Sequence, residues 1–260
     1  MKILIIADFE GISGVGSIAD LEPTSETYAH TCHCVAEDIN AAVCGAFTGG
    51  ATQVTVCEWH SGGRDVTADM LAQRVRFIPG KMSATARTVF HEAYDGLFFI
   101  GAHAMAGTLD AFVDHTRNVR EWHDFTIGGQ RHGEIGILAI LAGVRGTPLL
   151  LVTGDDAACR EGQAYGDSVV TIAIKRGLRW DIAELVPEDS ARATIRAGAA
   201  QAMSLIGQAW PYTVTYPAEV TVTLNRADYC EKLLARNSKL ERIDARMVRT
   251  TAIEAWDVLV

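Results

Sequence analysis

The fold is decided by the first eleven residues, MKILIIADFEG (residues 1–11). The apolar run of residues 1–7 is long enough for one buried strand, and Asp8 and Glu10 follow it at once. Because side chains alternate along an extended chain, these two carboxylates point to the same side and Phe9 points to the other. Ligands of α/β sheets bind beyond the carboxyl ends of the strands, so this acid pair lies where such a protein has its functional edge.

Two like charges held this close are costly unless a cation lies between them. The alternative interpretation is a pair of loop acids that face water. The choice between the two depends on whether the ends of other strands supply further ligands for a cation.

Apolar strands alternate with helices over the first part of the chain. We expect strands at residues 53–57, 96–100 and 149–152, and helices at about residues 26–47 and from about residue 134. Strand, helix and strand in repetition imply parallel pairing with right-handed crossovers. The sequence therefore predicts an α/β fold with a mainly parallel sheet and flanking helices.

The character of the sequence changes near Pro187. We expect a helix over residues 190–206, a strand within the alternating segment 212–224, and a second helix over residues 227–234. These elements predict a smaller α+β region. We accordingly divide the chain into an α/β metal-binding catalytic domain (residues 1–186) and a smaller C-terminal region (residues 187–260) packed on it.

Composition and charge argue against several classes of partner. The formal net charge is −9 and no Lys/Arg cluster is longer than a pair, so neither nucleic acid nor an anionic membrane is an expected partner. The N-terminal apolar run is too short for a signal peptide, and the apolar stretch 135–152 is interrupted by Arg145 and Pro148. Six cysteines in such a chain are expected to be reduced thiols in the cytoplasm.

Four of the expected strands end in acids or imidazoles. In chain order, the residues at these ends are Asp8 with Glu10, His60, His103, and Asp155 with Asp156. Strand ends that deliver carboxylates and imidazoles to one rim would build a site for zinc or a similar divalent ion. A pair of metal ions sharing one carboxylate would explain why the first strand carries two acids.

Two further residues are candidates for this site. Glu134 begins a helix after a glycine-rich loop and could be a ligand, although alone it is better explained as an acid stabilised by the helix dipole. A single loop histidine is more often ordinary than functional, but His60 and His103 end two separate buried strands. His115 could be a third imidazole ligand or an acid–base group beside the metals.

Other motifs point to different chemistry, and the sequence argues against each. Residues 30–34 contain two histidines and two cysteines, but neighbouring residues of a helix face different directions, so we interpret Cys32 and Cys34 as packing residues. The glycine-rich loop 11–16 lacks the spacing of dinucleotide and phosphate loops, which makes a nucleotide-binding oxidoreductase a weak alternative. No G-x-S-x-G elbow is present to support a serine hydrolase.

The ordered set of motifs resembles the D-aminopeptidases of the DppA type, a family of metallopeptidases. The resemblance covers essentially the whole chain. The matching stretches are residues 8–14, His60, residues 101–107, His115-Thr116, residues 133–136 and residues 148–156, with Lys175 and Pro187 in addition.

The resemblance implies both an activity and an assembly. The activity is that of a zinc-dependent aminopeptidase or amidohydrolase releasing N-terminal D-amino acids from short peptides or amides. The implied site is a dinuclear zinc centre with one bridging carboxylate, that of Asp8, and with His115 as the catalytic group. Its metal ligands would be Asp8, Glu10, His60, His103 and Glu134. The implied assembly is a homodecamer whose active sites face an internal channel.

The chain departs from the family pattern close to these residues. Cys57-Glu58-Trp59 stands where the family often has Asn-Asp-Ser, Gly128-Gly129 where Asn-Gly is common, and Leu138-Ala139 where Asn-Ala is usual. These changes leave the expected metal ligands intact and alter the substrate contacts around them. A hydrolase of another small amide, or a non-catalytic metal-binding assembly protein of the same fold, therefore stays open as an alternative.

Overall fold

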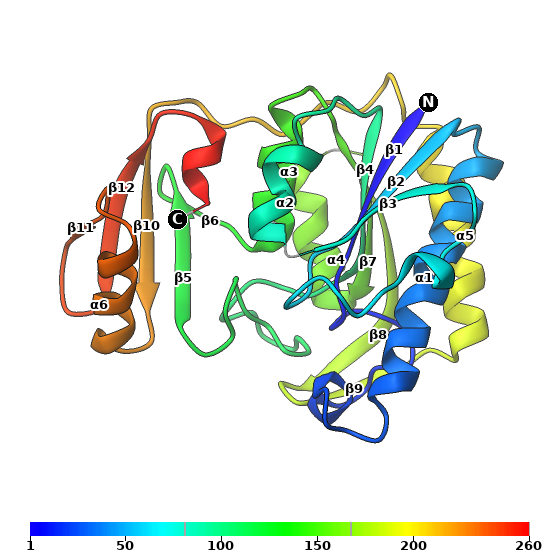
Figure 1. Cartoon of the computed structure of the whole chain (residues 1–260), viewed down its shortest axis with the longest axis horizontal. Helices are drawn as coiled ribbons and strands as arrows, with labels where there is room; N and C mark the ends of the chain where they lie inside the picture. The colour runs from blue at the N-terminus through cyan, green and yellow to red at the C-terminus, as the bar shows by residue number, and fades with distance from the viewer. Residues whose placement is uncertain (81, 167, 260) are drawn as a thin grey trace.

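The computed structural model describes residues 1–80, 82–166 and 168–259. Its helices and strands are arranged in layers (Figure 1). The strands of the first sheet are β1 (Lys2–Ala7), β2 (Gln53–Glu58), β3 (Val75–Ile78), β4 (Gly96–Ala102), β7 (Leu149–Asp155), β8 (Val170–Arg179) and β9 (Ile182–Leu185). Their order is β3-β2-β1-β4-β7-β8-β9. Neighbours pair in parallel except β8 and β9, which are antiparallel.

A second, antiparallel sheet lies beside the first. Its strands are β5 (Trp122–Ile127), β6 (Gln130–Arg131), β10 (Ala218–Leu224), β11 (Glu241–Arg242) and β12 (Met247–Ala252). They follow the order β11-β12-β10-β5-β6.

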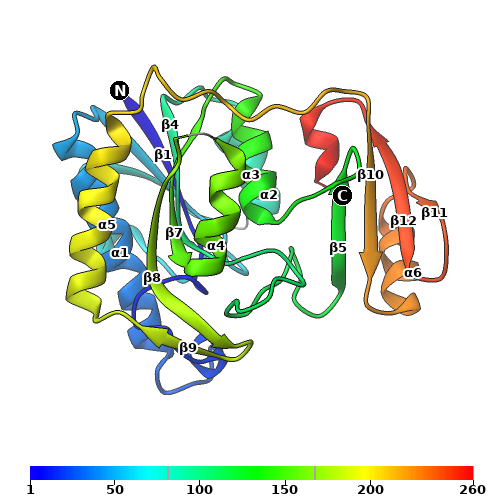
Figure 2. The same ribbon diagram turned by 180° about the vertical axis from the view of Figure 1, so that it is seen from behind.

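The helices fill the remaining layers. They are α1 (Tyr28–Thr48), α2 (Met82–Val89), α3 (Glu134–Gly143), α4 (Asp156–Gly162), α5 (Glu188–Met203) and α6 (Ala227–Arg236), with short 3-10 turns η1 (Ile18–Leu21), η2 (Ala68–Met70), η3 (Gln163–Tyr165) and η4 (Ala255–Val258). Both views show α1 and α5 on the outer face of the first sheet and α2, α3 and α4 between the two sheets (Figures 1 and 2). Helix α6 packs on the second sheet.

The central strand β1 is buried on both faces, as its continuous apolar run predicts. Ile3 and Ile5 belong to the core beneath α1 and α5, whereas Leu4 and Ile6 belong to the core between the sheets. Phe9 continues the first set, so it lies in the core beneath α1 and α5. The side chain of Asp8 accordingly leaves the sheet on the side of α3.

The topology places a crevice at the end of β1. The chain adds β2 and β3 on one side of β1 and then returns to add β4, β7 and β8 on the other. The order of the strands therefore reverses at β1 and β4. In open α/β sheets this switch point, at the carboxyl ends of the strands, is where ligands bind.

The expected α/β fold class is confirmed, and two details differ from the expectation. The sequence analysis did not identify β8 and β9 as strands. The strands of the second sheet come from both sides of the boundary drawn at residues 186 and 187, and α5 packs on α1 in the first unit. The division into residues 1–186 and 187–260 itself stays a prediction. No helix in the described part of the chain is long and apolar enough to cross a membrane.

Candidate metal centre

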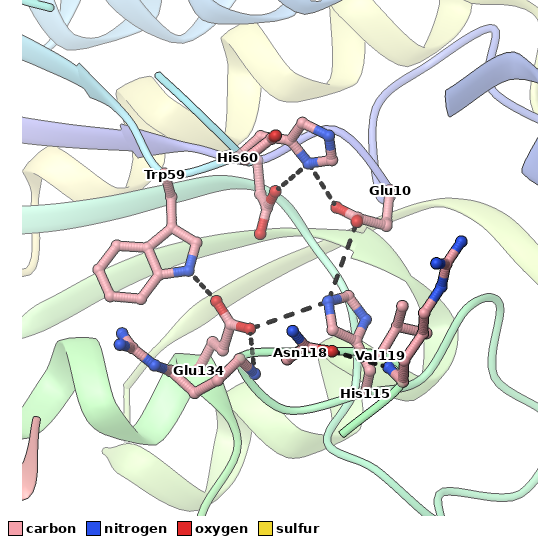
Figure 3. Close-up of a pocket in the computed structure, with 11 residues that line it drawn as sticks. Glu10, Trp59, His60, His115, Asn118, Val119 and Glu134 are labelled. Carbon is pink, nitrogen blue, oxygen red and sulfur yellow. Dashed lines mark hydrogen bonds and ion pairs between the residues drawn. The ribbon is translucent and has the colours of Figure 1, made fainter. Parts of the chain in front are cut away.

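The acids and imidazoles that follow the strands meet above the carboxyl edge of the first sheet. Ala7 of β1 pairs with Glu58 of β2 and with Ile100 of β4, so the three strands leave the sheet at one level. Glu134, the first residue of α3, approaches from the layer between the sheets. Figure 3 shows Glu10, His60, His115 and Glu134 turned toward one another.

Two glycines allow the ends of β1 and β4 to touch. The backbone N–H of Gly11 donates to the carbonyl oxygen of Gly101 at 2.9 Å. A Cβ on Gly11 would overlap the carbonyl oxygen of Ala102, and a Cβ on Gly101, whose φ is +76°, would overlap that of Asp8. Glycine is required at both positions, because this close backbone approach brings Asp8 beside His103.

His60 lies between the two acids of the first strand. Its Nδ1 atom is 3.2 Å from Oδ1 of Asp8 and 3.5 Å from Oε2 of Glu10. The other face of its ring stacks on Phe9, with the ring centres 4.5 Å apart. The ring of Phe9 thereby holds the imidazole against the carboxylates.

His103 and His115 form a second pair of imidazoles. Their rings stack with centres 3.8 Å apart. The Nδ1–H of His103 donates to the carbonyl oxygen of Ala104 at 3.0 Å, and that of His115 donates to the carbonyl oxygen of Val113 at 2.8 Å. Such bonds fix the tautomer and leave each Nε2 lone pair available to a metal or a proton.

The Nε2 atoms of these two histidines face the carboxylates. Nε2 of His103 is 3.7 Å from Oδ2 of Asp8 and 3.6 Å from Oε1 of Glu134. Nε2 of His115 is 4.0 Å from Oε1 of Glu10 and 3.9 Å from Oε1 of Glu134. Asp8 therefore presents one oxygen to His60 and the other to His103.

The cluster has the properties of a site for divalent cations. Oε2 of Glu10 and Nε2 of His103 are buried without a hydrogen-bond partner in the described structure, an arrangement that calls for a missing ion or water. Most of the separations above are too long for hydrogen bonds, whereas two ligand atoms on one tetrahedral zinc ion lie roughly 3.4 Å apart. Two overlapping groups could each hold an ion, Asp8 with Glu10 and His103, and His103 with His115 and Glu134.

The acids and imidazoles of the cluster shift one another's pKa values, because their charges are buried close together. Burial, followed by the charge of Glu10, raises the pKa of Asp8 to about 7. Burial acts in the same direction on Glu10, but the positive charge and hydrogen bond of His60 hold the pKa of that carboxyl well below its usual range. Burial alone would lower the pKa of His60, yet the two carboxylates raise it to about 11. Burial would likewise lower the pKa of His103, but Glu134 and the other neighbouring carboxylates raise it well above its ordinary value. His60 and His103 are thus both cations in the metal-free cluster.

Both oxygens of Glu134 are held by donors that the sequence analysis did not identify. The indole Nε1–H of Trp59 donates to Oε2, and the backbone N–H of Arg117 donates to Oε1 at 2.7 Å. The only signal in the sequence was that Trp59 directly precedes His60 within a segment that departs from the family pattern. Together the two donors fix the orientation of the carboxylate toward His103.

A cavity of about 430 Å³ opens over the cluster. Its wall includes residues 117–120 together with Asp8, Glu10, His60, His115 and Glu134. A small substrate can therefore reach the cluster from solvent.

The other acids at strand ends have structural roles. Asp155 caps α4 by accepting a hydrogen bond from the N–H of Ala158 at 2.7 Å, and it also accepts from the N–H of Phe112 at 2.8 Å. Asp156 pairs with Arg160 on the surface at 2.7 Å. Neither residue belongs to the cluster.

The cysteines of α1 pack as expected. Cys34 is fully buried in the core beneath α1 and α5, and Cys32 packs against the same core. Cys34 does lie close to His30 and Glu188 in a group that could hold an ion. The guanidinium of Arg192 already contacts both Glu188 and Cys34, so the place of a cation there is taken.

The fold and the cluster define an α/β protein with a carboxylate–imidazole centre, suited to divalent cations, at the switch point of its main sheet. The chain belongs to the D-aminopeptidase family of peptidases, whose model matches residues 1–260.

Individual relatives agree with this membership. A D-aminopeptidase of Bacillus subtilis (strain 168) is 29% identical over 177 residues, which cover 68% of this chain and 64% of that relative. The matched region is thus less than two thirds of the relative's length. The solved structure of the Zn-dependent D-aminopeptidase DppA from Bacillus subtilis, described as a self-compartmentalizing protease, superimposes with a TM-score of 0.92 at 22% identity, covering 99% of this chain and 94% of the other. At this level of identity the likeness establishes the fold.

Proposed function

We propose that this protein is a zinc-dependent aminopeptidase or amidohydrolase that releases N-terminal D-amino acids from short peptides or small amides. The observation that carries the proposal is the pair of buried, unpartnered atoms, Oε2 of Glu10 and Nε2 of His103, within a cluster of carboxylates and imidazoles. Membership of the D-aminopeptidase family supports the type of reaction. The zinc dependence of the DppA enzyme supports the choice of metal.

Five residues would hold two zinc ions in this proposal. They are Asp8, Glu10, His60, His103 and Glu134. Asp8 would bridge the ions, because its two oxygens face different histidines, at 3.2 Å from His60 and 3.7 Å from His103. A carboxylate that meets both halves of a cluster is suited to a two-metal site.

The residues of the chain have separate tasks in the reaction. Bound zinc would supply a Lewis acid and a lowered pKa for water. His115 presents Nε2 to the cavity while its Nδ1–H is held by the carbonyl of Val113, so Nε2 is placed to accept or return a proton, or to attack the substrate. Trp59 and the backbone of Arg117 keep Glu134 in position.

We also propose that the protein acts in the cytoplasm as a homo-oligomer, a decamer by its resemblance to the DppA type. The DppA enzyme's description as self-compartmentalizing supports self-assembly. Large side chains such as Trp210 and Leu109, each 84% exposed, are of the kind that subunit interfaces cover.

The test is hydrolysis with and without metal. Protein stripped with a chelator should be inactive, and zinc should restore hydrolysis of D-alanyl dipeptides and D-alanine amides. The matching L-isomers are the control for stereospecificity. Protein that binds zinc but hydrolyses nothing in a broad peptide and amide panel would instead be the non-catalytic metal-binding protein. Hydrolysis of amides without preference for D-isomers would favour a different small-amide hydrolase.

A further inference from the structure

The wall of the cavity beside the cluster carries two arginines. Arg117 and Arg120 line the same cavity as the acids and histidines of the candidate metal centre. Within the described residues, neither guanidinium donates a hydrogen bond or forms an ion pair; that of Arg117 lies over the ring of Trp59 and interacts electrostatically with Glu134. Two unpaired cationic groups therefore face a cavity whose other charged residues are carboxylates and histidines.

Arg117 is held in one place by its backbone. Its φ of +63° lies in the left-handed region, which a residue with a Cβ adopts at a cost and which is enriched at functional sites. Its N–H is bound to Oε1 of Glu134. The guanidinium carbon is 5.8 Å from the centre of the Trp59 ring, and that ring donates to the other oxygen of Glu134. The guanidinium and the cluster thus lie against the same indole ring.

Arg120 is positioned by the turn that follows. Oδ1 of Asn118 accepts hydrogen bonds from the N–H groups of Arg120 and Glu121, each at 3.0 Å. The carbonyl oxygen of Arg120 accepts from the side-chain amide of Asn225 at 2.9 Å. These bonds tie the turn to the end of β10 and hold the backbone that carries both arginines, which line the same cavity.

The chemistry of this rim favours one kind of ligand group. The planar fork of a guanidinium matches a carboxylate, with which it forms paired, charge-assisted hydrogen bonds. The protein carries a net charge of −9, so two unpaired arginines beside a set of carboxylates form a local exception to its surface charge.

We propose that Arg117 and Arg120 form a carboxylate subsite, which selects peptides with an anionic group one residue beyond the scissile bond. The subsite rests on the proposed aminopeptidase function. One further residue spans about 3.5 Å, so such a carboxylate stays near the cluster, beside the indole ring on which the Arg117 guanidinium packs. The carboxylate would come either from the C-terminus of a dipeptide or from an acidic side chain on its second residue.

Binding of uncleavable analogues tests the subsite directly. The probes are a D-alanyl dipeptide with its scissile amide reduced to a methylene amine, the same compound as a C-terminal amide, and that amide with an acidic second side chain. Each is titrated by calorimetry into zinc-loaded wild type, Arg117→Gln and Arg120→Gln. Arg145→Gln, an exposed arginine that does not line the cavity, is the matched control.

The free acid should bind wild type and the control about 10- to 100-fold more tightly than the neutral amide, as expected for hydrogen bonds between charged groups. Arg117→Gln should lose this preference while binding of the neutral amide stays unchanged. Arg117→Lys should recover part of it, because the charge remains and the fork is lost. Tight binding of the amide with the acidic side chain would assign the carboxylate to that side chain.

Equal binding of the acid and the amide by wild type would overturn the subsite, as would a loss in Arg117→Gln that is the same for both. Gln keeps the Cβ and the backbone contact to Glu134, and zinc content with circular dichroism checks the fold. Should Arg117→Gln fail to fold, the test uses Arg120→Gln, at an exposed position, which should also weaken the preference for the free acid. An unchanged preference in that variant would then overturn the subsite. The parent peptides are assayed in parallel. Absence of hydrolysis with the binding preference intact would refute the proposed function and leave the subsite standing.

Discussion

Replacing Trp59 with Phe removes one hydrogen bond from a candidate zinc ligand and little else. The indole Nε1–H is the donor to Oε2 of Glu134, whereas Oε1 keeps its bond from the backbone of Arg117. Phe retains an aromatic ring beneath the Arg117 guanidinium. Because Trp59 is 8% exposed and Glu134 is 2% exposed, water cannot readily take the place of the lost donor.

The expected cost follows from this geometry. A buried carboxylate that loses one of two donors is destabilised by about 1–3 kcal/mol. The retained bond to Arg117 places the effect toward the lower end, so the dissociation constant for zinc should rise about 10-fold. The stabilisation of the folded protein by saturating zinc should fall by about 1.4 kcal/mol for each tenfold loss.

Competition with a chromophoric chelator measures the zinc affinity, and thermal unfolding with and without zinc measures the stabilisation. Trp210→Phe is the matched control, because Trp210 is 84% exposed and does not line this cavity. A zinc affinity of Trp59→Phe equal to that of the control would refute the role of the indole in orienting Glu134.

Three further outcomes are expected. His115→Ala should keep its zinc and lose about 10²–10⁴-fold in kcat; joint loss of zinc and activity would make His115 a ligand instead. Asp8→Ala should lose more zinc than Glu10→Ala, because Asp8 faces both imidazole groups, and elemental analysis finding full zinc in Asp8→Ala would contradict the bridge. Burial raises the pKa of Asp38 to about 6 despite hydrogen bonds from Ser13, against 3.8 for the free side chain. Between these two pH values the folded state binds more protons than the unfolded state. The free energy of unfolding of wild type should therefore fall by roughly 3 kcal/mol relative to that of Asp38→Asn as pH rises through this window. Urea unfolding of both proteins at pH 4 and 7 measures this change. The same difference in stability at both pH values would contradict the expectation.

Local patterns were sufficient to predict the first sheet around β1. The apolar run of β1 and the alternation through Asp8, Phe9 and Glu10 depend only on neighbouring residues. The structure accordingly has Phe9 in the core beneath α1 and α5 and the two acids in the wall of the cavity. The meeting of His60 and His103 with these acids could be anticipated because the carboxyl ends of parallel strands share one edge.

Other parts of the fold depend on contacts distant in sequence. Strand β8 includes Lys175, which is 3% exposed and donates to the carbonyl oxygens of Glu10 and Val15 at 2.7 and 2.6 Å. A lysine interrupts the apolar pattern that marks a buried strand. Its burial is possible only because the tertiary structure supplies acceptors for its ammonium group. Strand β5 pairs with β10, almost a hundred residues later, and no local pattern specifies that partner.

The roles of Trp59 and Arg117 in holding Glu134 could not be predicted from sequence patterns for a similar reason. The bond from Trp59 to Glu134 depends on how α3 approaches the first sheet. The contact from Arg117 depends on a left-handed backbone conformation at a residue type that rarely adopts it. Neither feature produces a periodicity or a spacing in the sequence from which it could be predicted.

Helix α3 is buried along its whole length, from Glu134 to Gly143, between the two sheets. Its apolar residues share one core with strand residues of the second sheet such as Val220 and Phe125. The position of Glu134 therefore depends on the packing of this helix against both sheets. An ion held by Glu134 would lose this ligand whenever the helix moves away from the first sheet. The affinity for the metal would then depend in part on how firmly the two sheets are joined.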